Sequence, residues 1–234
     1  MINGITIEIC IGNIDDAITA SKYPIDRIEL NSAIELGGLT PSIETLKKLK
    51  GAISQKICCM VRPRGGDFIY SQNEFETMLL DGKNLLENGA DGIVFGFLNE
   101  DNTLDEERTK QMIDLAHSYG KEAIFHKAFD EVTDQFETIK KLADLNIDRI
   151  LTSGKAVYPE IIEGCKVINQ LYNQYGDRVQ LLPGGGVRIE NIQQVVTTTG
   201  SGQVHMTSKK QYPGGYLGLD EPQLQQMLQK LSEL

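Results

Sequence analysis

Eight short apolar segments recur along the chain, and each is followed by a stretch whose apolar residues have helical spacing. Strand followed by helix, repeated, is typical of a parallel sheet, and eight such units are the number that closes into a barrel. We therefore predict the α/β class and a (β/α)8 TIM-type barrel, with chemistry at the C-terminal ends of its strands. The segments begin near Ile5, Arg27, Lys56, Gly92, Glu122, Arg149, Gln180 and Gln203.

Local signals mark several boundaries. Ser71–Glu74 and Thr103–Glu106 have capping-box spacing, in which a hydroxyl and a carboxylate satisfy free amides at a helix start. Leu217–Leu234 has Leu and Gln at helical spacing and is predicted to be the closing helix, after an exposed loop at Lys209–Gly215. The 234 residues contain no Pro/Gly/Ser-rich linker, so residues 1–234 are predicted to form a single barrel domain.

A weak internal repeat supports the division of the chain into strand–helix units. An Asp-x-Ile cassette precedes the second, fourth and sixth predicted strands, at Asp26, Asp91 and Asp148. Such repetition at alternate strands is typical of duplicated folds. These residues belong to the N-terminal end of the barrel, where polar groups usually serve stability, so we do not assign them to the active site.

Composition limits which partners the protein can be expected to bind and in which cellular compartment it is expected. The balance of 23 basic against 33 acidic residues, a formal charge of −10, opposes a general affinity for nucleic acid or anionic membranes. The start of the chain resembles no secretory signal, and no apolar run approaches a membrane-spanning length. The four cysteines form no CxxC pair, so they are expected to be reduced thiols in a cytoplasmic protein.

Alternation along the strands points several charged side chains into the barrel. In the first strand the alternating isoleucines suit packing on helices, which turns Glu8 and Cys10 toward the barrel axis. The same reasoning directs Glu29, Arg62 and His126 inward, so a ligand-facing cluster is predicted at the strand ends. The alternative is that two glutamates and an arginine only neutralise one another inside the barrel.

His126 is followed by a carboxylate, Asp130, just past the end of its strand. General acid–base chemistry needs such a titratable pair close to a polarising cation, which Arg62 or Lys127 would supply. A structural role for both residues is the competing interpretation. We regard His205 in the eighth strand as a weaker candidate, because the sequence does not fix its height in the barrel.

A glycine-rich turn follows the seventh strand. Gly184, Gly185 and Gly186 would expose amides that can hold an oxyanion, and barrels often bind phosphate after strands seven and eight. Ser153 and Ser208 could add hydroxyl donors. The alternative is a tight turn that needs glycine only for its positive φ angles.

The loop after the third strand joins two guanidinium groups, Arg62 and Arg64, to a flexible Gly65-Gly66 pair. Guanidinium groups bind carboxylate or phosphate through paired hydrogen bonds, so Arg64 is a further candidate for anion binding. The competing interpretation is an ion pair between Arg64 and Asp67 that holds the loop.

Several long motifs are distinctive, and together they span nearly the whole chain. They are Glu8–Cys10, Asp26–Ser42, Met60–Ser71, the segment from Ala90, Phe125–Asp130, the segment from Asp148, and the segment from Pro183. These motifs resemble the copper homeostasis CutC family. The resemblance implies a TIM-type barrel, a cytoplasmic location, a homodimer or larger homo-oligomer, and a part in copper handling.

Copper binding needs soft donors, because Cu(I) prefers thiolate or thioether ligands and usually more than one. Cys10 matches the family cysteine of the first strand and is the candidate copper ligand. The family's usual second cysteine is Asn31 here. Cys58 and Met60 share the inward parity of the third strand and could partner Cys10, although core packing is the commoner role for such residues.

Two functions from different classes remain open: the resemblance assigns the first, which we take as the primary function, and the second is the alternative. In the first the protein handles copper, with Cu(I) as its candidate ligand. In the second it is an enzyme on a small phosphorylated or carboxylated metabolite, held by the glycine turn and the arginines while the strand-end cluster moves protons. Candidate surfaces for self-association are the exposed residues of Phe68–Phe75 and the Tyr212–Tyr216 loop, since aromatic residues are enriched at interfaces.

Overall fold

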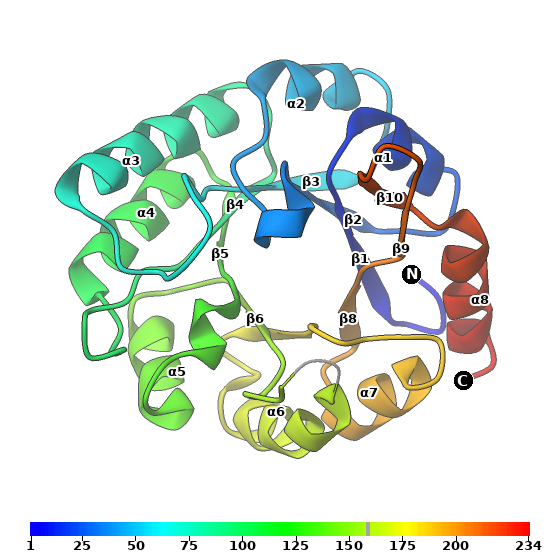
Figure 1. Ribbon diagram of the computed structural model, residues 1–234. Coiled ribbons are helices and arrows are strands. Elements are labelled where there is room, and N and C mark those ends of the chain that lie inside the picture. Colours follow the sequence, from blue (N-terminus) through cyan, green and yellow to red (C-terminus); the bar gives the residue numbers. More distant parts are fainter. Residues whose placement is uncertain (158–159) are drawn as a thin grey trace.

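The computed structural model describes residues 1–157 and 160–234. Its central element is an eight-stranded parallel sheet in which neighbouring strands follow the order of the chain, and β8 pairs with β1. The end strands β7 and β8 lie next to each other, so the sheet curls into a barrel, as predicted (Figure 1). The strands are β1 (Thr6–Ile11), β2 (Arg27–Leu30), β3 (Lys56–Met60), β4 (Gly92–Phe95), β5 (Glu122–Phe125), β6 (Arg149–Thr152), β7 (Gln180–Pro183) and β8 (Gln203–Met206).

Helices cover the outside of the barrel (Figure 1). The alternate strand residues that face them, such as Ile7, Ile9 and Ile28, are fully buried in one continuous apolar core. Burial of this kind is the main force that closes the fold. The helices are α1 (Ile14–Ala20), α2 (Ile43–Lys50), α3 (Gln72–Glu87), α4 (Glu106–Ser118), α5 (Gln135–Asp144), α6 (Ile161–Tyr175), α7 (Ile192–Thr199) and α8 (Glu221–Ser232).

Two boundaries differ from the sequence expectation. Ser71 forms the predicted capping box with Glu74, but helix α4 is capped by Asp105 and not by Thr103. Thr103 instead donates to Asp101 in the preceding turn, an arrangement that competes with capping. The closing helix is also shorter than predicted, because Leu217–Leu219 forms a strand.

That strand, β10, pairs with β9 (Lys209–Gln211) in a hairpin between β8 and α8. The loop expected at Lys209–Gly215 therefore contains a short strand, although its residues are largely exposed, as expected. Asp220 then caps α8 by accepting from the amide of Gln223. Two 3-10 turns, η1 (Ile34–Leu36) and η2 (Lys127–Asp130), follow β2 and β5, and η1 lies over the barrel opening (Figure 1).

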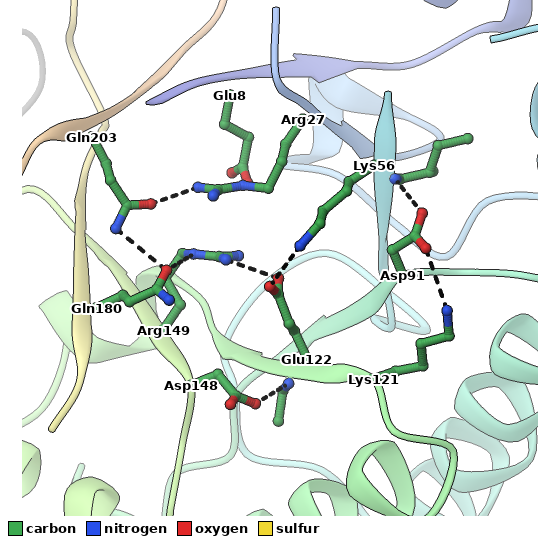
Figure 2. Close-up of polar contacts among 12 residues, drawn as sticks. Glu8, Arg27, Lys56, Asp91, Lys121, Glu122, Asp148, Arg149, Gln180 and Gln203 are labelled. Atoms are coloured by element: carbon green, nitrogen blue, oxygen red, sulfur yellow. Dashed lines mark hydrogen bonds and ion pairs between the residues drawn. The ribbon is translucent and has the colours of Figure 1, made fainter. Parts of the chain in front are cut away.

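The N-terminal end of the barrel is closed by a polar network of residues that mostly begin their strands (Figure 2). Arg27 Nε donates to Glu8 at 2.8 Å, and the Arg27 Nη2 donates to Gln203 at 2.8 Å. Across the barrel, Arg149 Nη2 donates to Glu122 at 2.8 Å and Arg149 Nε donates to Gln180 at 3.2 Å. The network pairs buried charges with opposite charges, which is the condition for keeping them inside a protein.

The Asp-x-Ile cassettes act as latches between consecutive strands. Asp26 accepts from the amide of Ile7 at 2.8 Å, which ties the turn before β2 to the start of β1. Asp91 does the same for β3 and Asp148 for β5, through the amides of Ile57 and Ala123. The structure therefore gives each cassette a structural role at the N-terminal end, as the sequence indicated.

We expect Asp91→Asn to lower the free energy of unfolding by about 1–3 kcal/mol at pH 7, because Lys50 loses its partner, as does Lys121 (Figure 2). Burial raises the pKa of Asp91, but Lys50 and the Ile57 amide outweigh burial and hold this pKa below its ordinary value. A lowered folded-state pKa stabilises the fold above the unfolded value of about 3.9, and the effect disappears as pH falls through the folded value.

Urea denaturation of the wild type and of Asp91→Asn, at pH 7 and at stepwise lower pH, measures the difference in their free energies of unfolding. This difference should shrink below about pH 4. Asp114→Asn, in an exposed pair with Lys110, is the control and should change stability by less than about 0.5 kcal/mol. A difference for Asp91→Asn that does not vary with pH would contradict the assigned role of the charge.

Candidate active-site cleft

Two adjoining cavities open at the C-terminal ends of the strands. The inner cavity, of about 130 Å³, lies over the barrel axis and is lined by Cys10, Glu29, Met60, Arg62 and His126 among others. The outer cavity, of about 360 Å³, lies beside the glycine turn after β7. Lys127, Leu151 and His205 line both cavities, so the two form one cleft where barrel enzymes carry their chemistry.

Three side chains from adjacent strands meet in the inner cavity. Cys10 in β1 is the register partner of Glu29 in β2, and His205 in β8 lies opposite Glu8 of β1. One ligand atom each from Cys10, Glu29 and His205 lies within 4.8 Å of the others. The sequence identified Cys10 and Glu29 but ranked His205 low.

Further residues orient this group. Glu8 Oε1 lies 2.8 Å from Nδ1 of His205, while Glu8 Oε2 accepts from Arg27. Asn31 Nδ2 donates to Glu29 Oε2 at 2.8 Å and lies 3.4 Å from the Cys10 sulfur. Glu8 is therefore placed behind His205 and outside the cavity lining, where it joins the polar network below to the cavity above.

Burial and neighbouring charges set the protonation of the group. Burial raises the pKa of Glu29, and the nearby Glu8 carboxylate raises it further. Burial also raises the pKa of the Cys10 thiol, with Glu29 acting in the same direction. Burial lowers the pKa of His205, but Glu29 and Glu8 outweigh burial and raise it overall.

His126 presents a neutral imidazole to the cavity. Burial lowers its pKa to about 3, and the charges of Arg62 and Lys127 act in the same direction. The Ala128 amide donates to Nδ1 at 3.1 Å, so the proton of the neutral ring belongs on Nε2. Nε2 is buried and has no hydrogen-bond partner within residues 1–157 and 160–234.

Asp130 does not pair with His126. Its carboxylate accepts from the Thr152 hydroxyl at 2.5 Å and from the amide and hydroxyl of Ser153, and it approaches Lys127 at 3.8 Å. Asp130 thus anchors the turn after β6 to η2. Of the predicted proton-transfer pair, only His126 lines the inner cavity.

The two arginines of the loop after β3 bind protein groups. Arg62 donates to the carbonyls of Leu36, Gly38 and Gly66, and its guanidinium lies 5.0 Å from the Phe68 ring centre. It therefore clamps the loops after β2 and β3 at the edge of the inner cavity.

Arg64 donates to Glu74 and Asp67 and lies outside both cavities. The pair with Asp67 is the alternative left open by the sequence. The Arg64 guanidinium thus joins the loop at Asp67 to Glu74 of α3.

The outer cavity contains part of the predicted anion set. Gly185 and Gly186 line it with φ angles of 88° and 111°, and no backbone hydrogen bond of the described chain uses their amides. Gly184, by contrast, donates its amide to Thr152, Ser153 donates its hydroxyl to Asp130, and Ser208 donates its hydroxyl to the Asp220 carbonyl.

Cations that the sequence analysis did not assign to this turn complete the outer cavity. Lys127, Arg188 and Lys209 all line it. A Cβ at Gly185 would lie 3.0 Å from Nζ of Lys127, so the ammonium group lies directly against the turn. Lys209 lines the cavity as the first residue of β9, just past the end of β8, a position that the exposed-loop prediction did not assign to a site.

The remaining cysteines are buried. Cys58 packs inside the barrel with Met60, Val94 and Ile124, and burial raises the pKa of its thiol to about 12. Cys59 and Cys165 belong to the core between strands and helices. All four cysteines are free thiols, and Cys10 is the one that is partly exposed.

The candidate surfaces for self-association differ from each other. In Phe68–Phe75 the rings of Tyr70 and Phe75 are buried, so most of its aromatic area serves the fold of this chain. Tyr212 and Tyr216 stack at 5.0 Å on the β9–β10 hairpin, and Tyr216 is 56% exposed. The hairpin is therefore the surface of the two that offers aromatic area to a partner.

The model of the CutC family matches residues 5–210. The chain belongs to the CutC family. A CutC family protein of Treponema denticola is 43% identical over 88% of this chain and 82% of its own length. The human relative named copper homeostasis protein cutC homolog is 35% identical over 91% of this chain and 77% of its own length.

Solved structures agree on the fold. A CutC protein from Streptococcus agalactiae has a TM-score of 0.80 and 34% identity, with 86% of this chain and 97% of that chain covered. Phosphoribosyl anthranilate isomerase from Thermotoga maritima has a TM-score of 0.60 at 13% identity, over 98% of this chain and 100% of that chain, and shares the barrel alone. Among the described residues of this chain, no helix is both long enough and apolar enough to cross a bilayer.

Proposed function

We propose that the cleft binds a small phosphorylated or carboxylated metabolite and stabilises negative charge that develops on it during a reaction. The observation that carries this proposal is the Nε2–H of His126, a buried donor without a protein acceptor in the described chain, in a side chain that lines the inner cavity. An unpaired buried donor costs free energy unless a ligand oxygen accepts from it. A carbonyl or oxyanion of a substrate would satisfy it.

The outer cavity would hold the anionic end of such a ligand. Lys127, Arg188 and Lys209 supply positive charge there, and the amides of Gly185 and Gly186 supply donors of the kind that bind phosphate. Because Lys127 and His205 line both cavities, an anion held in the outer cavity would place its adjoining atoms next to His126. A neutral imidazole donor can stabilise negative charge that develops on a substrate oxygen.

The other candidate residues would act through this arrangement. Arg62 would fix the two loops that border the inner cavity, and Asp130 would fix the turn that faces Lys127. Glu8 would hold His205. We assign these three residues positioning roles.

Inorganic phosphate is the first probe of the anionic end, and we expect it to raise the melting temperature of the protein. Lys127→Gln should weaken phosphate binding by about ten- to a hundredfold, the effect of losing a charge-assisted hydrogen bond. Calorimetry measures the affinities, and small phosphorylated and carboxylated metabolites are then compared with phosphate in the same assay.

Lys83→Gln is the matched control, because Lys83 lies on α3 in an exposed pair with Glu87. It should leave phosphate affinity unchanged. Equal phosphate affinity in the wild type and in Lys127→Gln would reject the outer cavity as the anion site.

Copper handling is the second candidate function, and the names of the relatives suggest it. The favouring observation is that Cys10, Met60 and His205, which carry soft or borderline donors, line one cavity. The donor set is incomplete for a two-thiolate Cu(I) site, since Asn31 stands beside Cys10 and Cys58 is packed among apolar side chains. We further propose a cytoplasmic location, where free thiols remain reduced, and self-association through the β9–β10 hairpin.

A further inference from the structure

Cys10, Glu29 and His205 have the composition of a three-ligand metal site. They come from three neighbouring strands, β2, β1 and β8, so the sheet fixes their relative positions. Their ligand atoms lie within 4.8 Å of one another. A tetrahedral zinc ion with bonds of about 2.0–2.3 Å holds its ligand atoms about 3.2–3.8 Å apart, so side-chain adjustments of about 1 Å would close the site.

The surroundings match those of metal ligands. Glu8 lies 2.8 Å from Nδ1 of His205, which leaves Nε2 as the ring nitrogen for a metal and fixes the ring by a carboxylate. Asn31 holds Oε2 of Glu29 at 2.8 Å in the same way. Glu8 is in turn fixed by Arg27, so the support extends into the polar network at the N-terminal end.

The donor set decides the class of metal. One sulfur, one nitrogen and one oxygen suit a borderline divalent ion such as Zn²⁺, whereas Cu(I) favours a second sulfur. Cys58 and Cys59 are buried on opposite sides of β3, in the barrel interior and in the outer core. Met60 lines the cavity but offers only a neutral thioether.

We propose that Cys10, Glu29 and His205 bind a divalent ion of the zinc class, with the fourth coordination position open to the inner cavity. Three protein ligands and an open position are the arrangement of catalytic rather than structural zinc sites. A bound ion there would act as a Lewis acid toward a substrate in the cleft. That use rests on the proposed function, whereas metal binding itself does not.

The test uses the full chain, stripped with a chelator and kept reduced without oxygen. Titration with Co²⁺ should saturate at one ion per chain and give a thiolate-to-cobalt charge-transfer band. The visible d–d absorption bands should have the high intensity that is typical of tetrahedral Co²⁺. Zn²⁺ should displace the cobalt. Cys10→Ser should abolish the charge-transfer band and weaken Zn²⁺ binding at least a hundredfold against a chromophoric chelator, and Glu29→Gln should weaken it at least tenfold.

Cys165→Ser is the matched control, because Cys165 is buried in α6 and its thiol donates to the Ile161 carbonyl, a contact that serine preserves. It should bind cobalt like the wild type. Far-ultraviolet circular dichroism establishes that each variant is folded, and the conservative Glu29→Gln gives a second reading should Cys10→Ser fail this check.

Absence of stoichiometric cobalt or zinc binding would overturn the proposal, as would unchanged binding in Cys10→Ser. The same chelator competition with Cu(I) tests the second candidate function. Stoichiometric Cu(I) binding that Zn²⁺ cannot match would overturn the zinc-class assignment and favour copper handling. Phosphate binding by the metal-free protein is measured separately, so failure of the metal site and failure of the anion site are distinguishable.

Discussion

Gly164→Ala should lower the free energy of unfolding by about 2–4 kcal/mol, although alanine favours a helix by about 1 kcal/mol. Gly164 lies in the first turn of α6, where a Cβ would lie 1.8 Å from the Ser153 carbonyl oxygen and 3.1 Å from Cβ of Ala156. The contact is with backbone, which cannot rotate away as a flexible side chain does. The turn after β6 would have to move.

Gly82→Ala is the matched control, since Gly82 is also buried inside a helix. Its Cβ would lie 3.3 Å from the Met112 sulfur and 3.4 Å from a Leu115 methyl group, and both are side-chain atoms that can shift. We expect a change of less than about 1 kcal/mol in urea denaturation. Similar losses for the two variants would show that the close approach of α6 to Ser153 is not the cause.

Arg27→Met should lower the free energy of unfolding by about 3–5 kcal/mol, because it leaves the Glu8 carboxylate buried without its arginine. Glu8 is 3% exposed and Arg27 is 6% exposed, and the two are 2.8 Å apart. Water cannot replace the lost partner at this depth. Chemical denaturation at pH 7 measures the effect.

Adding Glu8→Gln to Arg27→Met should restore part of the loss, since the uncompensated charge is then removed. Arg178→Met is the surface control. Arg178 pairs with Asp144 at 2.8 Å but both side chains are about half exposed, so the loss should stay below about 1 kcal/mol. A small effect of Arg27→Met itself would mean that His205 alone compensates Glu8.

The sequence predicted the barrel because its signals are local and repeated. Each apolar segment and each helical stretch can be identified without its neighbours, and the parity of Glu8, Cys10 and Glu29 follows from alternation along a single strand. His205 has the same kind of signal, since it lies between the apolar Val204 and Met206. The register of His205 against β1 could not be predicted, because it depends on how the barrel closes.

The side-chain partners could not be predicted either. Arg62 and Arg64 have the composition of anion-binding residues, yet loop carbonyls accept from the terminal nitrogens of Arg62, and carboxylates accept from Arg64. Asp130 follows His126 closely in the chain, but η2 turns its carboxylate toward Ser153. Such choices depend on loop conformations, which respond to contacts distant in sequence and leave no periodic pattern.

The latches at Asp26, Asp91 and Asp148 make the connections of the barrel unequal. Each carboxylate binds an amide of the strand that precedes its own turn, so the turns before β2, β4 and β6 are tied to β1, β3 and β5. Each hydrogen bond therefore lies within one strand–helix–strand unit. New chain ends placed at residues 51–55 or 119–121 would fall between such units and spare every latch. A circularly permuted or split barrel opened there would retain them, whereas one opened between α3 and β4 would separate Asp91 from the strand it secures.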